Sequence, residues 1–473
     1  MRGIEGALQV LEQTRQGGKD PAPAGGKSGG ARRSAGNGVL FASEVLRKLS
    51  EDMTPGDRTL ASSLVYAVLR RQEMWRAIYE KFLKDPRGDE SLPPFIRDCL
   101  LLGTAGLLEL RHFAGGVLVN GLLDHLKARS QKRWVPLVNA VLHNVGEKGA
   151  EQMEALRRSP APEERALWAG VPVWSLPAWT RTWQRPDLNR LFDLMPLPPR
   201  SSLRPAPGKR DELLKVLGEH GMKAEPSPLS EAVHLEGTVL PAEVPGFDRG
   251  DVTVQTEGSI LAASLAARLF KGGGCILDLC SGRGVKGGQV LQMCPDARLE
   301  GWELSEGRHK SALREMRRLG VAGRAKLRRG SALELEPLEP PSLVMLDAPC
   351  SGSGTWTRKP DSKWRLDWDR LDRLSAAQRN LLERAVALCA PRGIILYITC
   401  SLLRQENENV VAEVLAAHPE CAELPVSPED GTAAGPSEAA GTRPFHRGRP
   451  WGTYIWPETP WLDGFYCAVI MKK

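Results

Sequence analysis

Hydrophobic residues recur at the spacing of one helix face from Val39 to about Val145. In the stretch LASSLVYAVLRRQEMWRAIYEKFL, the apolar positions that fit this spacing are Leu60, Leu64, Val68, Trp75 and Tyr79. A second long helix is expected after Pro94, because proline suits the first turn of a helix. The stretch RWVPLVNAVLHNV closes the series. The pattern predicts an all-helical domain, to which we assign residues 1–148.

Two other stretches lack this clear periodicity. Residues 17–38 are rich in glycine and nearly without large apolar side chains, so they are predicted to form a flexible loop. Residues 149–235 begin with tryptophans among prolines, namely Trp168, Trp174, Trp179 and Trp183. We favour packing over base stacking for these rings. The region ends with a helix pattern and then a strand pattern, which predicts a linker followed by a small α/β element.

From about Asp251 onward, short apolar runs alternate with helical patterns. The expected strands are CILDL, LEGWEL, AKLR, LVMLD, GIILYIT and FYCAVIM, and SAAQRNLLERAVALCA is one of the expected helices. Such alternation is typical of a doubly wound α/β sheet. We assign this domain to residues 236–473 and expect residues 424–450, rich in Pro, Gly and Ala, to be a loop insertion before the last strand.

Composition indicates which kinds of site and which cellular compartment to expect. The chain has 473 residues, a net charge of +7 and nine cysteines without a CxxC pair, so a disulfide framework and a metal site are both unexpected. No signal peptide and no apolar run long enough to cross a bilayer is found, and we expect a cytoplasmic protein. Nine Lys or Arg lie between Arg308 and Arg329. They form either a solvated face or a face for polyanions.

A glycine-rich turn follows the first strand of the predicted sheet. In LDLCSGRGVKGG, Gly282, Gly284 and Gly287 spell G-x-G-x-x-G, and Glu303 ends the next strand. Such a turn lets the backbone approach a nucleoside, and the acid can accept ribose hydroxyls. The pattern fits a dinucleotide-dependent dehydrogenase and an S-adenosylmethionine (SAM) methyltransferase equally well.

The next strand ends favour a methyltransferase. Asp347, Cys350 and Cys400 all lie at carboxyl ends of predicted strands, where ligand chemistry takes place in such sheets. A hydride-transfer enzyme has no use for two thiols there. A cytosine methyltransferase does have a use for thiols, because carbon-5 of cytosine becomes nucleophilic only after a thiolate adds to carbon-6. A single cysteine is usually a small, buried apolar residue. That explanation is less suited to two cysteines that both lie in polar turns at strand ends.

Three motifs carry a family resemblance over nearly the whole chain: LDAPCSGSGTWTRKPDSKW, YITCSLLRQENENVV and DGFY. The chain resembles the RNA cytosine-carbon-5 methyltransferases of the RsmB/Nop/Sun superfamily, and its helical part is similar to a NusB-type RNA-binding domain. The resemblance implies a Rossmann-like SAM methyltransferase sheet preceded by an all-α NusB-like domain, with a small α/β RNA-binding element in residues 149–235. It implies small-subunit ribosomal RNA as the substrate. Two alternatives remain: an enzyme with the same chemistry on tRNA, and a non-catalytic RNA-binding paralogue that acts in ribosome assembly.

The resemblance also implies roles for single residues. Cys400 is similar to the family nucleophile, and Cys350 to the cysteine that helps release the product; the DNA cytosine methyltransferases suggest the reverse assignment. Asp347 resembles the aspartate between cofactor and base, and Lys286 the lysine that closes the cofactor loop. The implied cofactor-binding residues are Cys280, Ser281, Gly282, Arg283, Gly284, Val285, Lys286, Glu303, Ser331 and Asp347.

Some positions depart from the family pattern. The cofactor loop usually reads Ala-Ala-Pro-Gly-Gly-Lys, whereas Arg283 stands here for the proline and Val285 for a glycine. Ser331 stands where an acid near the adenine is expected. These departures are expected to affect cofactor affinity more than the chemistry. A basic helix with Arg314, Arg317 and Arg318 on one face would suit RNA phosphates. The expected protein is a monomer that binds RNA, without a metal or a membrane.

Overall fold

A computed structural model describes residues 2–16, 41–85, 87–110, 113–272, 274–424, 445–448 and 450–473. The chain divides into two compact units. The helical unit comprises Met1–Pro177 and Lys359–Arg365, and the sheet unit comprises Ala178–Arg358 and Leu366–Lys473. The expected loop at 17–38, and most of the one at 424–450, lie outside the described residues. The domain boundaries at 148 and 235 stay predictions.

The helical unit confirms the all-helical prediction. Its helices are α1 (Arg2–Gln16), α2 (Ala42–Leu49), α3 (Pro55–Arg70), α4 (Gln72–Glu80), α5 (Pro94–Glu109), α6 (Gly115–Ala128), α7 (Val135–Arg158) and α8 (Pro162–Ala169). Helix α5 begins at Pro94, as the sequence predicts. The long pattern between Leu60 and Leu83 forms two helices, because the backbone of Arg71 leaves the helical region at φ −139°.

The segment Lys359–Arg365, far along the sequence, belongs to the helical unit. Asp361 accepts a hydrogen bond from the amide of Ala42 at 2.9 Å and so caps the start of α2. The Lys363 ammonium donates to the carbonyl of Arg70 at 2.6 Å. Burial, and then the charge of Arg70, lower the pKa of Lys363 to about 7. The Trp364 indole donates to the carbonyl of Leu69 at 2.6 Å, so this segment is anchored by three polar contacts.

The sheet unit contains a small antiparallel sheet of order β2-β3-β1-β4. Its strands are β1 (Ser202–Pro205), β2 (Ala224–Pro226), β3 (Val233–Leu235) and β4 (Val252–Val254), and α11 (Arg210–Glu219) packs against it. The small sheet therefore continues to Val254, beyond residue 235.

The main sheet has the order β11-β12-β13-β9-β8-β5-β6-β7, and β10 pairs with β13. Its strands are β5 (Cys275–Asp278), β6 (Arg298–Glu303), β7 (Ala325–Arg329), β8 (Pro341–Asp347), β9 (Ile394–Thr399), β10 (Cys421–Glu423), β11 (Phe445–Arg447), β12 (Thr453–Ile455) and β13 (Phe465–Lys472). Strands β5 to β9 are parallel, and β13 runs antiparallel to β9. The doubly wound α/β prediction is confirmed.

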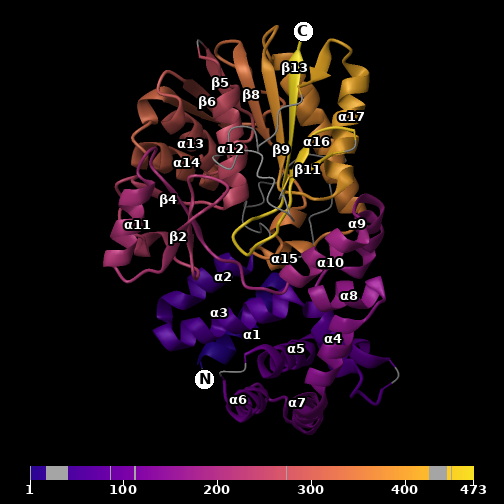
Figure 1. Ribbon diagram of the computed structural model, residues 1–473. Helices are drawn as coiled ribbons and strands as arrows, with labels where there is room; N and C mark the ends of the chain where they lie inside the picture. The colour runs from indigo at the N-terminus through magenta and orange to yellow at the C-terminus, as the bar shows by residue number, and fades with distance from the viewer. Residues whose placement is uncertain are drawn as a thin grey trace, which may run out of the picture. The chain divides into compact units, whose positions relative to one another are not determined.

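Helices cover both faces of this sheet (Figure 1). Besides α11, the helices assigned to the sheet unit are α10 (Arg185–Leu194), α12 (Glu257–Leu269), α13 (Val285–Met293), α14 (Glu306–Arg318), α16 (Trp368–Leu388) and α17 (Glu408–Ala417). The division between the units falls within α9 (Leu176–Thr182), and α15 (Pro360–Lys363) belongs to the helical unit. Side chains of α12, α13 and α14 build the apolar core with β5, β6, β8, β9 and β13. The chain winds outward from β5 to β7 and then returns to β8, beside β5. Ligands bind at such a reversal, outside the carboxyl ends of the strands.

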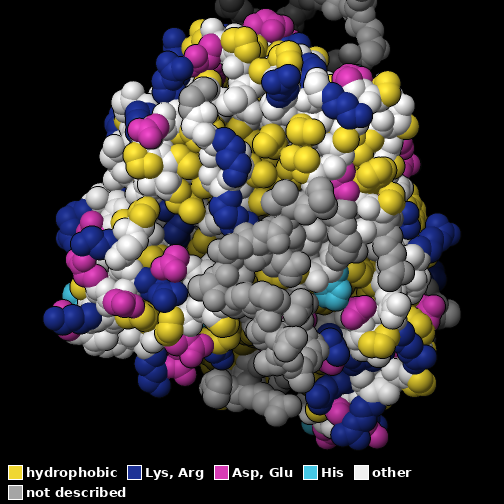
Figure 2. Space-filling model, turned by 45° about the horizontal axis from the view of Figure 1, so that its top comes forward, with side chains coloured by type: hydrophobic (Ala, Val, Ile, Leu, Met, Phe, Trp, Pro, Cys, Tyr) yellow, Lys and Arg dark blue, Asp and Glu magenta, His cyan; other side chains and the backbone are white. Residues whose placement is uncertain are grey.

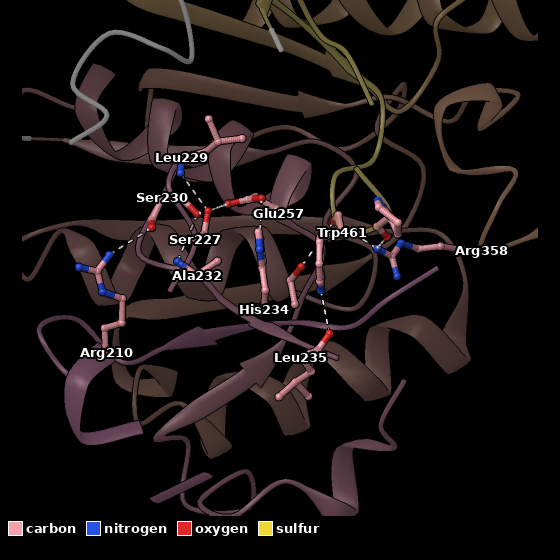
Figure 3. Close-up of polar contacts among 12 residues, drawn as sticks. Arg210, Ser227, Leu229, Ser230, Ala232, His234, Leu235, Glu257, Arg358 and Trp461 are labelled. Carbon is pink, nitrogen blue, oxygen red and sulfur yellow. Dashed lines mark hydrogen bonds and ion pairs between the residues drawn. The ribbon is translucent and has the colours of Figure 1, made fainter. Parts of the chain in front are cut away.

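A buried polar cluster connects the small sheet to α12 (Figure 3). Glu257, which is fully buried at the start of α12, accepts hydrogen bonds from the hydroxyls of Ser227 and Ser230. Its other oxygen lies 2.9 Å from Nε2 of His234 on β3. The ring of His234 stacks on Trp461, with centroids 4.8 Å apart. Each of these polar groups has a partner, so the cluster joins the two sheets of the unit.

The basic helix α14 is used differently from the prediction. Arg318 donates to the carbonyls of Phe247 and Val252 and pairs with Glu315 at 2.7 Å, so its predicted role at RNA phosphates is wrong. Arg314 and Arg317 are exposed. Over much of the visible described surface, Lys and Arg side chains lie beside Asp and Glu (Figure 2). In the part of the chain that the structure describes, no helix is both long and apolar enough to span a membrane.

Candidate active site

The carboxyl edge of the parallel strands gathers the predicted site residues. Strand β5 ends at Asp278, β6 at Glu303 and β8 at Asp347, while Cys400 follows β9 directly. The register pairs Asp278 with Gly301 and with Met345, and Asp347 with Ile398. The four strand ends therefore lie along the same edge of the sheet, as the sequence predicts.

The glycine turn after β5 takes a shape that only glycine adopts readily. Gly282 and Gly284 have φ of 56° and 80°, in the left-handed region. A Cβ on Gly284 would also lie 3.0 Å from the methyl carbon of Met316 on α14. Ser281 holds the turn, since its amide donates to the carbonyl of Trp302 at 2.9 Å. Arg283 is exposed, and Val285 is the first residue of α13, so neither departure distorts the turn.

Asp278 is buried beneath this turn, and its Oδ1 has no hydrogen-bond partner among the described residues. Burial, and then the negative charge of Asp347, raise the pKa of Asp278 to about 7. A buried acid with one unpaired oxygen, near a second acid, favours a cationic ligand. SAM carries a sulfonium and an ammonium group together with a ribose diol, so the residues present fit this cofactor.

Glu303 is the last residue of β6, and its predicted role as a ribose ligand stays a prediction. Its carboxylate is buried and accepts from the amide of Ser305 at 2.6 Å and from the Arg308 guanidinium at 2.8 Å. Ser331 lies just beyond β7, where its hydroxyl accepts from the amide of Leu333 at 3.3 Å. Burial, and then the charge of Asp278, raise the pKa of the Cys280 thiol far above its ordinary value, so this cysteine stays protonated.

Lys286 and Asp347 form an ion pair of 2.6 Å between α13 and the end of β8. Burial by itself would lower the pKa of Lys286, but the charges of Asp347 and Cys400 outweigh it and raise that pKa. Nζ also lies 5.4 Å from the centroid of the Phe465 ring. Lys286 is therefore a fixed positive charge on which the charge of Cys400 acts.

The two predicted cysteines are in contact. Sγ of Cys350 lies 3.3 Å from Sγ of Cys400, although the residues are fifty positions apart. The hydrogen bond with Cys400, then burial, then the charges of Cys400 and Glu406, raise the pKa of Cys350 well above its ordinary value. The thiol of Cys350 is therefore held towards its protonated form, and Cys400 is the sulfur whose charge acts on Lys286.

Two glycines bring the loop after Cys350 against the DGFY stretch. Gly464 donates from its amide to the carbonyl of Gly354 at 2.9 Å, and the amide of Gly354 donates to the carbonyl of Cys400 at 3.0 Å. A Cβ on Gly354 would lie 2.2 Å from the carbonyl oxygen of Gly464. The backbones approach this closely only because both residues lack side chains.

Sequence reasoning missed Asp278 and Glu406 as site residues. Glu406, in the short 3-10 helix η8 (Arg404–Glu406), is fully buried and reaches the loops that carry both cysteines. The stretch RQENENVV contains this acid. Its position six residues after Cys400 of the Thr-Cys motif could have identified it as a candidate site residue.

The chain is similar to known proteins over most of its length. The family model for 16S rRNA methyltransferase RsmB/F matches residues 269–471, and the NusB family model matches residues 34–147. The chain is similar to ribosomal RNA small subunit methyltransferase B of Xanthomonas campestris pv. campestris, with 28% identity over 458 residues, 92% of this chain and 93% of the relative. The protein of the same name from Klebsiella pneumoniae strain 342 is 30% identical over 418 residues, which are 84% of this chain and 92% of that one. The crystal structure of PH0851 is similar in fold, with a TM-score of 0.72 over 99% of each chain at 20% identity.

Proposed function

The chain belongs to the family of SAM-dependent small-subunit ribosomal RNA methyltransferases B, and on this premise we propose that it methylates carbon-5 of a cytosine in RNA. The observation that carries this proposal is the 3.3 Å contact between Cys350 and Cys400 at the cofactor edge of the sheet. Methylation of a ring nitrogen or of a ribose hydroxyl gives no role to two adjacent thiols. Methylation of carbon-5 does.

SAM supplies the methyl group when it is bound. Asp278 and Asp347 offer negative charge to its cationic groups, and Glu303 offers a carboxylate to the ribose hydroxyls. The glycine turn leaves room for the nucleoside against the backbone. Lys286 holds Asp347 in place through their ion pair, and it neutralises part of the acidic cluster.

Cys400 is proposed as the nucleophile. Its thiolate would add to carbon-6 of the cytosine, and the electrons of the carbon-5–carbon-6 double bond would make carbon-5 able to take the methyl group. The Lys286 ammonium, whose pKa the charge of Cys400 raises, stabilises that thiolate before attack. The base must leave its stack to reach the sulfur, which favours an RNA loop or a partly folded RNA.

Cys350 is proposed to act in product release. After methyl transfer, carbon-5 must lose its proton before the bond between carbon-6 and Cys400 can break. The Cys350 sulfur touches Cys400 and follows the strand end of Asp347 by three residues, so we propose that it relays that proton, passing its own proton to the Asp347 carboxylate as it takes the one from carbon-5. The electrons of the carbon-5–hydrogen bond then restore the ring double bond, and Cys400 leaves as a thiolate.

The substrate proposed is the RNA of the small ribosomal subunit, as in the names of the relatives. The helical unit, which the NusB family model matches, is proposed to add affinity for this RNA. Lys and Arg that contact phosphates would make this affinity fall with salt concentration.

Gel electrophoresis and nucleoside analysis test the proposal together. Small-subunit RNA lacking the modification is incubated with the protein and SAM, and 5-methylcytidine is measured by mass spectrometry. Cys400→Ala should abolish both the product and any covalent complex. Cys350→Ala should leave protein attached to RNA on a denaturing gel. Accumulation of the adduct with Cys400→Ala instead would support the reverse assignment of the cysteines, and SAM binding without 5-methylcytidine on any RNA would contradict the proposed activity.

A further inference from the structure

A single buried carboxylate connects the loops that carry the two cysteines. Oε1 of Glu406 accepts from the amide of Ser351 at 2.7 Å and from Nε2 of Gln378 at 3.0 Å. Oε2 accepts from the hydroxyls of Ser351 and Ser401. Ser351 directly follows Cys350, and Ser401 directly follows Cys400. Glu406 therefore holds the residue next to each sulfur.

Further hydrogen bonds tie the same loops together around this carboxylate. Ser353 and Ser401 share a contact of 3.0 Å between their hydroxyls, and the amide of Leu402 donates to the Ser353 hydroxyl at 2.8 Å. Gln378 also donates to the carbonyl of Pro349, which precedes Cys350, at 2.8 Å. All of these side chains are buried. The separation of the two sulfurs is thus set by the polar network rather than by the cysteines themselves.

A carboxyl group without a cationic partner is uncommon at a position as buried as that of Glu406. Among the residues that the structure describes, no Lys, Arg or His pairs with this carboxylate. Burial raises the pKa of Glu406, and the hydrogen bonds from Ser351, Ser401 and Gln378 oppose that rise. A neutral side chain of the same shape would bind the same partners, so the network alone does not explain why an acid is used here.

We propose that Glu406 is a positioning residue for the cysteine pair: it holds the loops after β8 and β9 together and keeps the proton on Cys350, so that Cys400 is the sulfur that ionises. The inference rests on the proposed function, because it explains which of the two cysteines attacks. The titratable groups that face Cys350 are Cys400, Glu406 and Tyr397, whose hydroxyl donates to the carbonyl of Glu406 at 2.6 Å. Of these, Glu406 is the carboxylate.

Glu406→Gln removes the charge and can keep the geometry. The amide oxygen can accept from the Ser351 amide and from Gln378, as Oε1 does now. The amide nitrogen has two hydrogens to donate, and the hydroxyls of Ser351 and Ser401 can accept them by rotating. The variant therefore separates charge from position.

The test measures alkylation of each cysteine in the full chain, without RNA or SAM, as a function of pH by iodoacetamide labelling and mass spectrometry. In Glu406→Gln, the pH profile of Cys350 should move to lower pH. Its labelling rate at a fixed pH below its pKa should rise about tenfold for each unit by which the pKa falls. Glu257→Gln is the matched control, because Glu257 is also a buried carboxylate that accepts from two serine hydroxyls, outside the cysteine loops (Figure 3).

A second variant tests the positional part and guards against a folding defect in the first. Ser401→Ala keeps the charge and unties the Cys400 loop from it. Diamide should then join the two cysteines into a disulfide more slowly than in the native chain, with the Cys350 profile less shifted than in Glu406→Gln. A Cys350 profile in Glu406→Gln that coincides with those of the native chain and of Glu257→Gln would overturn the charge role. Unchanged disulfide formation in Ser401→Ala would overturn the positional role.

The two proposals fail in different ways. If the chain forms 5-methylcytidine but Glu406→Gln leaves the Cys350 profile in place, the inference about Glu406 is wrong and the proposed function stands. If the profile shifts as expected but the native chain forms no 5-methylcytidine, the proposed function is wrong while Glu406 still controls the thiols.

Discussion

Replacing Gly354 by alanine should damage both the stability of the sheet unit and the cysteine site. An added Cβ would lie 2.2 Å from the carbonyl oxygen, 2.6 Å from the carbonyl carbon and 2.7 Å from the Cα of Gly464. Ordinary van der Waals contact begins at 3.4 Å, and all three atoms belong to the backbone. The two loops must therefore separate, because no side chain can turn away.

The size of the effect follows from what this separation breaks. Moving the nearest contact from 2.2 to 3.4 Å would lengthen the hydrogen bond from the Gly464 amide to the Gly354 carbonyl, now 2.9 Å, beyond bonding distance. Overpacking of this kind costs about 1–3 kcal/mol, and each lost hydrogen bond about 1 kcal/mol. Alanine recovers about 0.4–1 kcal/mol by restricting the unfolded chain. The expected net loss is about 1–4 kcal/mol.

Urea unfolding followed by tryptophan fluorescence measures this loss, and iodoacetamide labelling follows the site. Because the Gly354 amide donates to the carbonyl of Cys400, the displaced loop should also change the labelling rate of that cysteine. Gly307→Ala is the control, since a Cβ at Gly307 on α14 meets nothing within 4 Å. If Gly354→Ala shows the same unfolding midpoint and the same Cys400 labelling rate as Gly307→Ala, the reasoning is refuted.

Three further predictions concern separate parts of the chain. The pKa of Asp278 is about 7 in the folded chain against an ordinary value of 3.8, so its contribution to stability is present below about pH 4 and lost as pH rises through about 7, where the buried charge costs about 4 kcal/mol. Asp278→Asn should thus be more stabilising at about pH 8 than at about pH 5 in urea unfolding, and a difference independent of pH would contradict this. Asp361→Ala removes the cap of α2 and should cost about 1–2 kcal/mol, seen as faster hydrogen exchange in α2, whereas unchanged exchange would show that the cap is unimportant. Diamide should join the two active-site sulfurs, which are 3.3 Å apart, into a disulfide of about 2.05 Å detectable in peptide mass spectra, and its absence in the native chain would argue against the contact.

Much of the architecture could be predicted from the sequence, because it depends on neighbours along the chain. The helix after Pro94 begins where the sequence places it, since proline fits a first turn and cannot continue one. Short apolar runs that alternate with helical patterns predicted the parallel sheet, and Gly282 and Gly284 do adopt the left-handed turn expected of them. The strand-end positions of Asp347 and Cys400 also followed from local pattern alone.

The partners of charged side chains could not be predicted in this way. Arg318 belongs to a run of basic residues that suggested a phosphate-binding face, yet it donates to two backbone carbonyls more than sixty residues away. Lys363 follows the Pro-Cys motif closely but is buried in the helical unit. A run of basic residues in a sequence predicts a positively charged surface only where no other segment of the chain folds against those residues.

The sequence by itself determined that two thiols and two acids would reach one edge of a sheet. Only the tertiary structure decided that the sulfurs touch, that one carboxylate oxygen of the buried Asp278 has no hydrogen-bond partner, and that Glu406 bridges Ser351 and Ser401. The reason is physical: strand and helix patterns arise from interactions a few residues apart, whereas contacts such as that between Ser351 and Glu406 join residues 55 positions apart. Their hydrogen bonds and pKa shifts exist only after the chain has excluded water from the space between them.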